Sequence, residues 1–372
     1  MQVERISKFQ LLALIIFHEI GSTTLFARGI GAKQDAWIAI VIGMLMGFVI
    51  LWVYTQIQLT YPNKNLPEIL IAVLGKWVAC PLALLYALSF FFTAVFNLRE
   101  FTELFTITIL PSTPLTVLIL FVMFTSIYAV SSGIEVLARS AELALPFYLF
   151  FLLLIFTLTL ASGIADFSKL KPVLENGFKP VFSNAFPSIL NFPFGEMSIF
   201  LMYWKYVNSK SDFRKISFVS VGISGIFLIV SVIIMISVLG VRITTGTWIP
   251  LFEVIKLINV GDFITNLDPI GIIFILIGGF FKMTLFFYGG VLILQTLFKI
   301  THKNWLIILC AIFLSSVSIL YFPNLTYHRW VGLNIHTPYI DTMFYIIIPT
   351  LILMIIWVKS KAQKEENKHA NN

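Results

Sequence analysis

Apolar segments of helix length recur along this 372-residue chain and limit what it can fold into. A helix needs roughly 20 apolar residues to cross the hydrocarbon core of a bilayer. Turn sequences such as YPNKNLP at 61–67 and LPSTP at 110–114 separate the segments. The pattern predicts an all-α integral membrane protein with ten transmembrane helices. We place them at 8–29, 36–60, 80–104, 114–131, 141–163, 185–206, 215–240, 268–298, 304–321 and 341–358.

The amino-acid composition excludes a soluble domain of this length. Hydrophobic residues make up 59% of the chain, charged residues make up 12%, and the mean hydropathy is +0.95. Soluble domains usually carry about 25% charged residues, so a globular core could not hide this much apolar surface from water. The net charge of +7 is spread in small groups between the apolar segments. We therefore expect membrane lipid around the chain and no nucleic-acid partner.

The distribution of basic residues predicts the orientation of the chain. With a cytoplasmic N-terminus, 15 of the 25 lysine and arginine residues fall on the cytoplasmic side and nine on the opposite side. The remaining one, Lys282, lies inside the eighth segment. Because cytoplasmic loops carry an excess of lysine and arginine, we expect both termini in the cytoplasm.

Two of the predicted spans are interrupted near their middles. IGSTT at 20–24 interrupts the first span, and NFPFGE at 191–196 interrupts the sixth. These are the first spans of two groups of five, and interruptions at corresponding positions point to a transporter binding site. Because five is odd, the second group would be inverted. We expect a first repeat at 1–163, an extracytoplasmic loop at 164–184, a second repeat at 185–358 and a cytoplasmic tail at 359–372.

The first interruption contains Gly21, Ser22, Thr23 and Thr24. Glycine weakens a helix and hydroxyl side chains compete for backbone hydrogen bonds, so we expect the helix to unwind here. Unwinding would leave N–H groups at the positive end of the outer half-helix, which suits a carboxylate. The alternative is that these small residues only allow two helices to approach closely.

The second interruption contains Phe192, Pro193, Phe194, Gly195 and Glu196. Proline removes a donor and frees a carbonyl one turn earlier, and exposed carbonyls can accept from an ammonium group. Donors in one break and acceptors in the other would fit a zwitterionic amino acid. The alternative is a proline kink in which neighbouring groups satisfy the glutamate.

Three ionisable residues lie centrally in predicted spans: Glu19, Glu196 and Lys282, with His18 beside the first. A charge at the bilayer centre costs about 2.5–3.5 kcal/mol on insertion scales, so it usually faces protein or water. Lys282 has no acidic neighbour along its own helix, so it must lose its proton or pair with another helix, and Glu19 and Glu196 are the candidates. Glu19 could carry a proton, pair with Lys282 or be a satisfied structural acid.

Other features predict packing rather than a site. Arg99 and Glu103, four residues apart, predict an ion pair within one helix. The glycines of GMLMG at 43–47 and the pairs at 278–279 and 289–290 predict close helix contacts. The sequence contains no nucleophile–base arrangement, zinc-ligand spacing or phosphate-binding loop. We therefore expect no enzyme activity, catalytic residue, metal site or cofactor.

Several segments carry a family resemblance. IGSTTLF at 20–26 and FPFGE at 192–196 look like the two unwound segments of the amino acid–polyamine–organocation superfamily, which has the LeuT-type fold. More narrowly, the chain resembles the spore germinant receptor B subunits, the GerAB-like spore permease family, over essentially its whole length. The segments that carry this narrower likeness are LREFTE at 98–103, LPSTP at 110–114, GIEVLARSAEL at 133–143 and KPVLENGFKPVFSNAFPSILNFPFGE at 171–196.

The resemblance implies ten helices in a LeuT-type 5+5 inverted repeat with broken helices 1 and 6. It implies a subunit in the inner membrane of the spore that senses a small nutrient, typically an amino acid. The signal would pass to an A subunit and a C lipoprotein, with a small D subunit in some receptors. By position, residues 21–24 and 192–196 would line the ligand pocket. Lys282 lies in the helix that helps to form the sodium site of sodium-coupled relatives, where it would replace the ion or shuttle a proton.

Two alternative functions stay open from the sequence. A proton-coupled amino acid permease would use the same pocket but carry its ligand across the membrane. An ion-conducting channel subunit would need a continuous polar lining, which the periodicity does not reveal. In the receptor interpretation, ligand bound between the two broken helices closes them and shifts a rocking equilibrium that partner subunits read.

Overall fold

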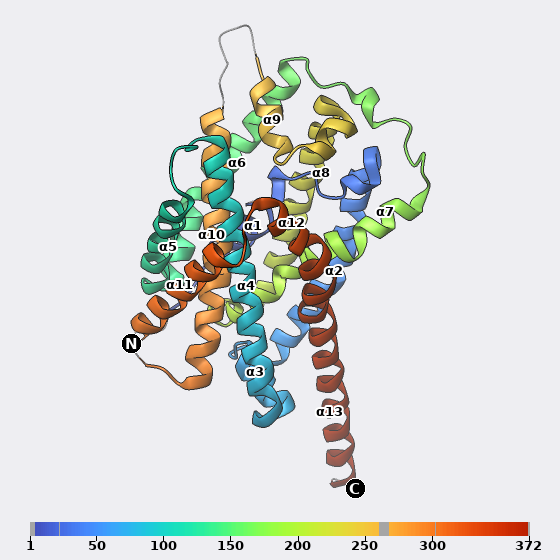
Figure 1. Cartoon of the computed structure of the whole chain (residues 1–372). Coiled ribbons are helices and arrows are strands. Elements are labelled where there is room, and N and C mark those ends of the chain that lie inside the picture. The colour runs from blue at the N-terminus through green and yellow to red at the C-terminus, as the bar shows by residue number, and fades with distance from the viewer. Residues whose placement is uncertain (1–3, 22, 260–267, 302, 371–372) are drawn as a thin grey trace.

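The computed structural model describes residues 4–21, 23–259, 268–301 and 303–370 of the chain, and throughout these ranges the regular structure is helical. One isolated bridge joins Ile6 to Val207. Helix α13 extends past the other helices toward the C-terminus (Figure 1). The helices are α1 (Lys8–Ile20), α2 (Ala36–Thr60), α3 (Leu66–Leu74), α4 (Lys76–Thr108), α5 (Leu115–Ser131), α6 (Ile134–Ala161), α7 (Phe178–Asn184), α8 (Phe213–Gly246), α9 (Pro250–Leu257), α10 (Asp268–Phe298), α11 (Lys303–Leu320), α12 (Leu325–Val331) and α13 (Ile348–Ala370).

Short 3-10 and π segments connect or interrupt these helices. The π segments are η4 (Ala185–Ile189) and η7 (Gly332–Ile347), and η7 makes α12 and α13 one continuous helical rod. The 3-10 segments are η1 (Thr23–Leu25), η2 (Ile30–Asp35), η3 (Phe167–Leu170), η5 (Phe194–Met202) and η6 (Trp204–Tyr206).

Seven helical segments of the described chain are long and apolar enough to cross a membrane, and α5 is a shorter apolar helix. Each of these eight coincides with one of the ten predicted spans. The other two predicted spans, 8–29 and 185–206, are the two expected to be broken, and each consists of shorter helical pieces. The structure is therefore consistent with ten crossings of the membrane by a multi-pass integral membrane protein. The seven long segments are Ile30–Thr60, Lys76–Thr108, Ile134–Ala161, Phe213–Gly246, Ile277–Phe298, Lys303–Leu320 and Leu325–Ala362.

The first broken span begins with a capped helix and ends where the sequence turns polar. The Ser7 side chain and Gln10 form a capping box that starts α1. The N–H of Gly21 donates the last helical bond, to the carbonyl of Phe17 at 3.0 Å. The chain resumes as η1, and Gly29 adopts a left-handed conformation (φ 76°) before η2, a conformation that costs glycine little.

The second broken span owes its interruption to proline. After α7, the chain passes through η4 and reaches Pro193, which caps η5. Proline has no N–H to give to the preceding turn, so the α-helical ladder cannot run through this position. The piece that follows, η5, is a 3-10 segment rather than an α-helix.

Glycines mark the closest helix contacts, as the sequence predicts. Helix α10 contacts both α4 and α1 near the middle of the bundle (Figure 1). A Cβ on Gly279 or Gly290 would overlap the ring of Phe101 or Phe91 on α4. The predicted packing role of these glycines is confirmed, and so is the Arg99–Glu103 ion pair, which joins Nε to Oε1 at 2.5 Å.

Candidate functional site

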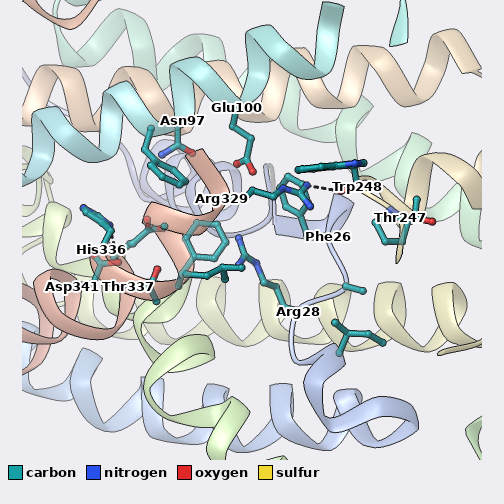
Figure 2. Close-up of a pocket in the computed structure, with 18 of the residues that line it drawn as sticks. Phe26, Arg28, Asn97, Glu100, Thr247, Trp248, Arg329, His336, Thr337 and Asp341 are labelled. Carbon is teal, nitrogen blue, oxygen red and sulfur yellow. Dashed lines mark hydrogen bonds and ion pairs between the residues drawn. The ribbon is translucent and has the colours of Figure 1, made fainter. Parts of the chain in front are cut away.

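A cavity of about 260 Å³ lies where the two broken spans meet α4, the end of α8 and the α12–η7 rod. Figure 2 shows its labelled side chains converging from several elements. We call this the central cavity. It is lined by Phe26, Ala27, Arg28, Ile30, Thr93, Phe96, Asn97, Glu100, Phe192, Glu196, Thr244, Thr245, Thr247, Trp248, Pro250, Arg329, Gly332, Leu333, His336, Thr337 and Asp341.

A buried ion pair stands beside the central cavity. Lys282 Nζ on α10 lies 2.5 Å from Glu196 Oε2 on η5, with side-chain exposures of 0% and 3%. The approach is short, but it lacks the geometry of a well-directed hydrogen bond, so we describe it as an ion pair. The same ammonium lies 3.9 Å from the centre of the Phe192 ring. Because Glu196 lines the cavity, this pair connects the cavity to α10.

The other two ionisable residues of the first span lie close to this pair. His18 and Glu19 are fully buried on α1. Their side-chain nitrogen and oxygen atoms make no hydrogen bond with the part of the chain that the structure describes. The His18 ring packs against Phe200 and Phe286, with centroids 5.4 and 5.2 Å apart. Glu19 is close enough to Lys282 and Glu196 to interact electrostatically with both, so the three predicted intramembrane charges form one cluster.

The predicted pocket residues of the first break that the structure describes do not line the central cavity. Gly21 packs against Gly278 of α10, where an added Cβ would come 2.5 Å from the carbonyl oxygen. The hydroxyl of Thr24 donates to the carbonyl of Ile20 at 3.0 Å. Thr23 is buried but, like Gly21 and Thr24, does not line the cavity. Ser22 lies outside the described residues.

A tyrosine from α6 serves the carbonyl groups of the first break. The hydroxyl of Tyr148 lies 3.3 Å from the carbonyl oxygens of both Ile20 and Gly21. Backbone groups released by unwinding need such partners when they are buried. The unwound backbone therefore obtains hydrogen bonds from the protein itself.

Of the second break, Phe192 and Glu196 line the central cavity, whereas Pro193, Phe194 and Gly195 do not. The carbonyl of Gly195 accepts from the Tyr54 hydroxyl at 2.8 Å, and that hydroxyl also contacts the carbonyl of Tyr345. The second break thus contributes one aromatic ring and one carboxylate to the cavity.

Helix α4 contributes a polar face that the sequence reasoning missed. Thr93, Asn97 and Glu100 all line the cavity, and Phe96 lies between them. Residues three and four positions apart share one helix face. Polar residues at 93, 97 and 100 inside an apolar helix therefore predict a polar face on that helix. Of its polar residues, the predictions from sequence considered only the neighbouring Arg99–Glu103 pair.

Two arginines from distant parts of the chain also line the cavity. The guanidinium carbon of Arg28 lies 3.9 Å from the centre of the Phe192 ring. The guanidinium carbon of Arg329 lies 4.2 Å from the centre of the Trp248 ring, and its Nη2 donates to the Trp248 carbonyl at 2.6 Å (Figure 2). Both guanidinium groups also flank Phe26, at 5.5 and 5.4 Å from its ring centre.

Another part of the cavity wall comes from η7, which places a histidine beside an aspartate. His336 Nδ1 lies 3.2 Å from Asp341 Oδ2, and both side chains are buried. The Tyr345 hydroxyl lies 3.3 Å from Thr93 Oγ1, which joins η7 to α4. Asn191 donates to the Thr337 carbonyl and to Thr342 Oγ1, each at 2.7 Å.

At the start of α1, away from the central cavity, the two broken spans are fastened to each other. The N–H of Ile6 donates to the carbonyl of Tyr206 at 2.9 Å, and the N–H of Asn208 donates to the carbonyl of Ile6 at 3.1 Å. Lys8 forms an ion pair with Asp212. Hydrogen bonds from Lys8 and Ser209 hold the pKa of the Asp212 carboxyl below its usual value.

Comparison with known sequences finds spore germination proteins. The model of the spore permease family, described as "Spore germination protein", matches residues 5–326. Spore germination protein KB of Bacillus subtilis (strain 168) is 34% identical over 371 residues, covering all of both chains. Spore germination protein XB of Bacillus anthracis is 23% identical over 339 residues, covering 89% of this chain and 91% of that protein.

Comparison with solved structures finds transporters. MhsT in complex with L-phenylalanine aligns with a TM-score of 0.71 at 14% identity, covering 96% of this chain and 89% of MhsT. Mhp1, a nucleobase-cation-symport-1 family transporter, aligns with a TM-score of 0.58 at 15% identity, covering 89% and 75%. At these identities the likeness concerns the fold alone. The predicted all-helical, LeuT-type transporter fold is confirmed.

Proposed function

Because this chain belongs to the spore permease family of spore germination proteins, we propose that it is the membrane subunit of a spore germinant receptor. It binds a small nutrient, an amino acid in our proposal, in the central cavity between the two broken spans. Binding is sensed by partner subunits rather than completed as transport. The observation that carries this proposal is a cavity where the broken spans meet, lined by both cationic and acidic side chains.

The ion pair at the cavity wall supplies a route by which binding changes the protein. Glu196 belongs to the cavity lining, and its partner Lys282 belongs to α10. A ligand shifts a conformational equilibrium only by its difference in affinity for the two states. A ligand that contacts Glu196 only when the broken spans close around it would have such a difference. In this proposal Lys282 is the fixed cation of the site, and Glu19 is a second acid that interacts electrostatically with it.

The partners and the location follow from the same proposal. The chain would lie in the inner membrane of the spore with both termini in the cytoplasm. It would signal to a receptor A subunit and a C lipoprotein, and in some receptors to a small D subunit. We propose repeats at 1–163 and 185–358, joined by an extracytoplasmic loop at 164–184 and followed by a cytoplasmic tail at 359–372.

The test uses the full chain reconstituted in nanodiscs and in liposomes. Labelled L-amino acids are offered one at a time, and binding and uptake are measured separately. The receptor proposal expects saturable binding without accumulation inside the liposomes. Accumulation driven by a proton gradient would instead support the alternative function, a proton-coupled amino acid permease with the same cavity. A complete lack of binding by any amino acid would refute both.

The role of Lys282 is tested by a pair of lysine variants. Lys256 is exposed and pairs with Glu253 at 2.9 Å on α9, so Lys256→Ala is a matched control. We expect Lys282→Ala to weaken ligand binding far more than Lys256→Ala. Equal effects of the two substitutions would remove Lys282 from the proposed site.

A further inference from the structure

The central cavity contains charges that the protein leaves without ion partners. Neither Arg28, Arg329 nor Glu100 forms an ion pair within 4.0 Å among the described residues. By contrast, the other two acids of the lining are paired, Glu196 with Lys282 and Asp341 with His336. The unpaired set therefore consists of two cations and one carboxylate.

These three groups line the same cavity, in which Glu100 is buried and the two arginines are half-buried. Figure 2 shows the Arg28 and Glu100 side chains extending into the same cavity as Arg329, whose guanidinium group is hydrogen-bonded to Trp248. Glu100 is 7% exposed, and Arg28 Nε is buried without a hydrogen-bond partner among the described residues. The three groups also interact electrostatically with one another. A buried charge without a close partner costs free energy. A ligand that supplies the partner removes this cost, which favours its binding.

The two arginines are held by rings rather than by acids. Arg28 lies over Phe192, and Arg329 lies over Trp248 and donates to its carbonyl. Stacking fixes the plane of a guanidinium while it leaves most of its five donors available. Planar, pre-oriented donors of this kind match a carboxylate, which accepts two parallel hydrogen bonds.

We infer that the ligand is an amino acid whose carboxylate is bound by Arg28 and Arg329 and whose ammonium group is bound by Glu100. This inference deepens the proposed function and rests on it. It moves the carboxylate from the backbone of the first break, which the sequence favoured, to two side chains at the cavity. The cavity volume of about 260 Å³ lies just below the range of pockets for drug-sized ligands, as suits a ligand of this size.

An uncharged nutrient such as a sugar or nucleoside does not fit this arrangement. It would displace water from both guanidinium groups and the Glu100 carboxylate without giving any of them a partner within ion-pair distance. A zwitterion supplies one partner for each sign. The remaining positive charge favours carboxylates over amides of the same shape.

The experiment measures equilibrium binding to the full-length chain in nanodiscs. The probes are the twenty L-amino acids, the C-terminal amide of each one that binds, and D-glucose and inosine as ligands without a carboxylate. We expect an amino acid to bind and its amide to bind about 10- to 100-fold more weakly, as the loss of a charge-assisted pair implies. This comparison needs no substituted protein.

Variants then locate the carboxylate. Arg28→Gln and Arg329→Gln should each weaken binding of the acid about 10-fold or more while changing binding of the amide much less. Arg139→Gln is the matched control, because Arg139 is exposed on α6 and pairs with Glu135. Arg28→Lys, which keeps the charge, should recover part of the loss. Glu100→Gln should weaken the acid and its amide alike, because both carry the ammonium group.

Four results would overturn the inference, and the last two of them concern the proposed function as well. Amides that bind as tightly as the acids would exclude carboxylate recognition. If the arginine substitutions weaken the binding of acids and amides equally, the arginines shape the cavity and do not recognise the carboxylate. Binding of glucose or inosine alone would exclude an amino acid ligand. If no probe binds, the ligand-binding function itself fails, whereas the first two results leave it standing.

Discussion

Replacing Lys282 with methionine should destabilise the protein more than any surface substitution. Lys282 and Glu196 are 2.5 Å apart with side-chain exposures of 0% and 3%. Removing one partner of a buried pair leaves a buried charge uncompensated and costs about 3–5 kcal/mol. Lys282→Met removes the ion-pair partner of Glu196 and the nearby cation of Glu19, and both acids are buried. Glu196→Gln still leaves Lys282 with Glu19 nearby, so it should cost less.

The double variant Lys282→Met/Glu196→Gln separates charge from packing. Replacing both partners of a buried pair by uncharged groups of similar volume is often neutral or stabilising. We therefore expect the double variant to recover most of the loss, with an interaction free energy of about 3 kcal/mol in the double-mutant cycle. The measurement is unfolding of the detergent-solubilised protein in increasing sodium dodecyl sulfate, monitored by circular dichroism.

A matched control comes from the exposed pair on α9. Lys256 and Glu253 are 2.9 Å apart with side-chain exposures of 42% and 39%, so Lys256→Met should cost about 0–1 kcal/mol. The reasoning is refuted if Lys282→Met costs no more than this control. It is also refuted if the double variant is as unstable as Lys282→Met alone, because the loss would then come from packing.

Three further predictions concern other contacts. Gly21→Ala should destabilise the protein by about 1–3 kcal/mol, measured in the same titration, because the added Cβ would overlap Gly278. Tyr54→Phe should cost about 0.5–1.5 kcal/mol, because its hydroxyl serves two buried carbonyls. The Asp212 pKa is lowered by Lys8, so its contribution to stability is present at neutral pH and lost as pH falls through that lowered pKa. Asp212→Asn should remove this acidic part of the pH dependence in thermal melts between pH 7 and pH 3.

Each of these predictions has a contradicting outcome. A Gly21→Ala protein as stable as wild type would show that α1 and α10 do not need this close approach. A Tyr54→Phe protein of unchanged stability would mean that other donors serve the two carbonyls. An Asp212→Asn protein with the same melting profile across this pH range would exclude the Lys8–Asp212 pair as a source of stability.

The breaks in the two spans could be predicted from sequence because their causes are local. Proline removes its own hydrogen bond wherever it stands, and glycine followed by hydroxyl residues weakens any helix. The structure accordingly interrupts α1 after Ile20 and places Pro193 between two helical pieces. Apolar length likewise located the eight other helical segments, because the bilayer sets that length.

The lining of the central cavity could not be predicted in the same way. Arg28 and Arg329 are about 300 residues apart in the sequence. Each looks like a single basic residue near the end of a span, and neither carries a local signal of a binding site. Arg28 follows Phe26 by two residues, and only tertiary packing brings Arg329 to the same ring. The α4 face differs, because the spacing of Thr93 and Asn97 was visible in the sequence and a helix-face count would have found it.

Gly21 shows why a residue with a strong local signal can have its role elsewhere. Its lack of a side chain accounts both for the weak helix and for the contact with Gly278. Gly278 lies one turn before Lys282 on α10, and Lys282 pairs with Glu196 at the cavity. The end of α1 is thus packed against α10, the helix whose Lys282 pairs with Glu196 of the second break. A ligand that displaces Glu196 must either break the pair or move α10, and α10 cannot shift toward α1 without a clash at the two glycines. A broken helix can in this way matter for binding through the helix it rests on, without touching the ligand.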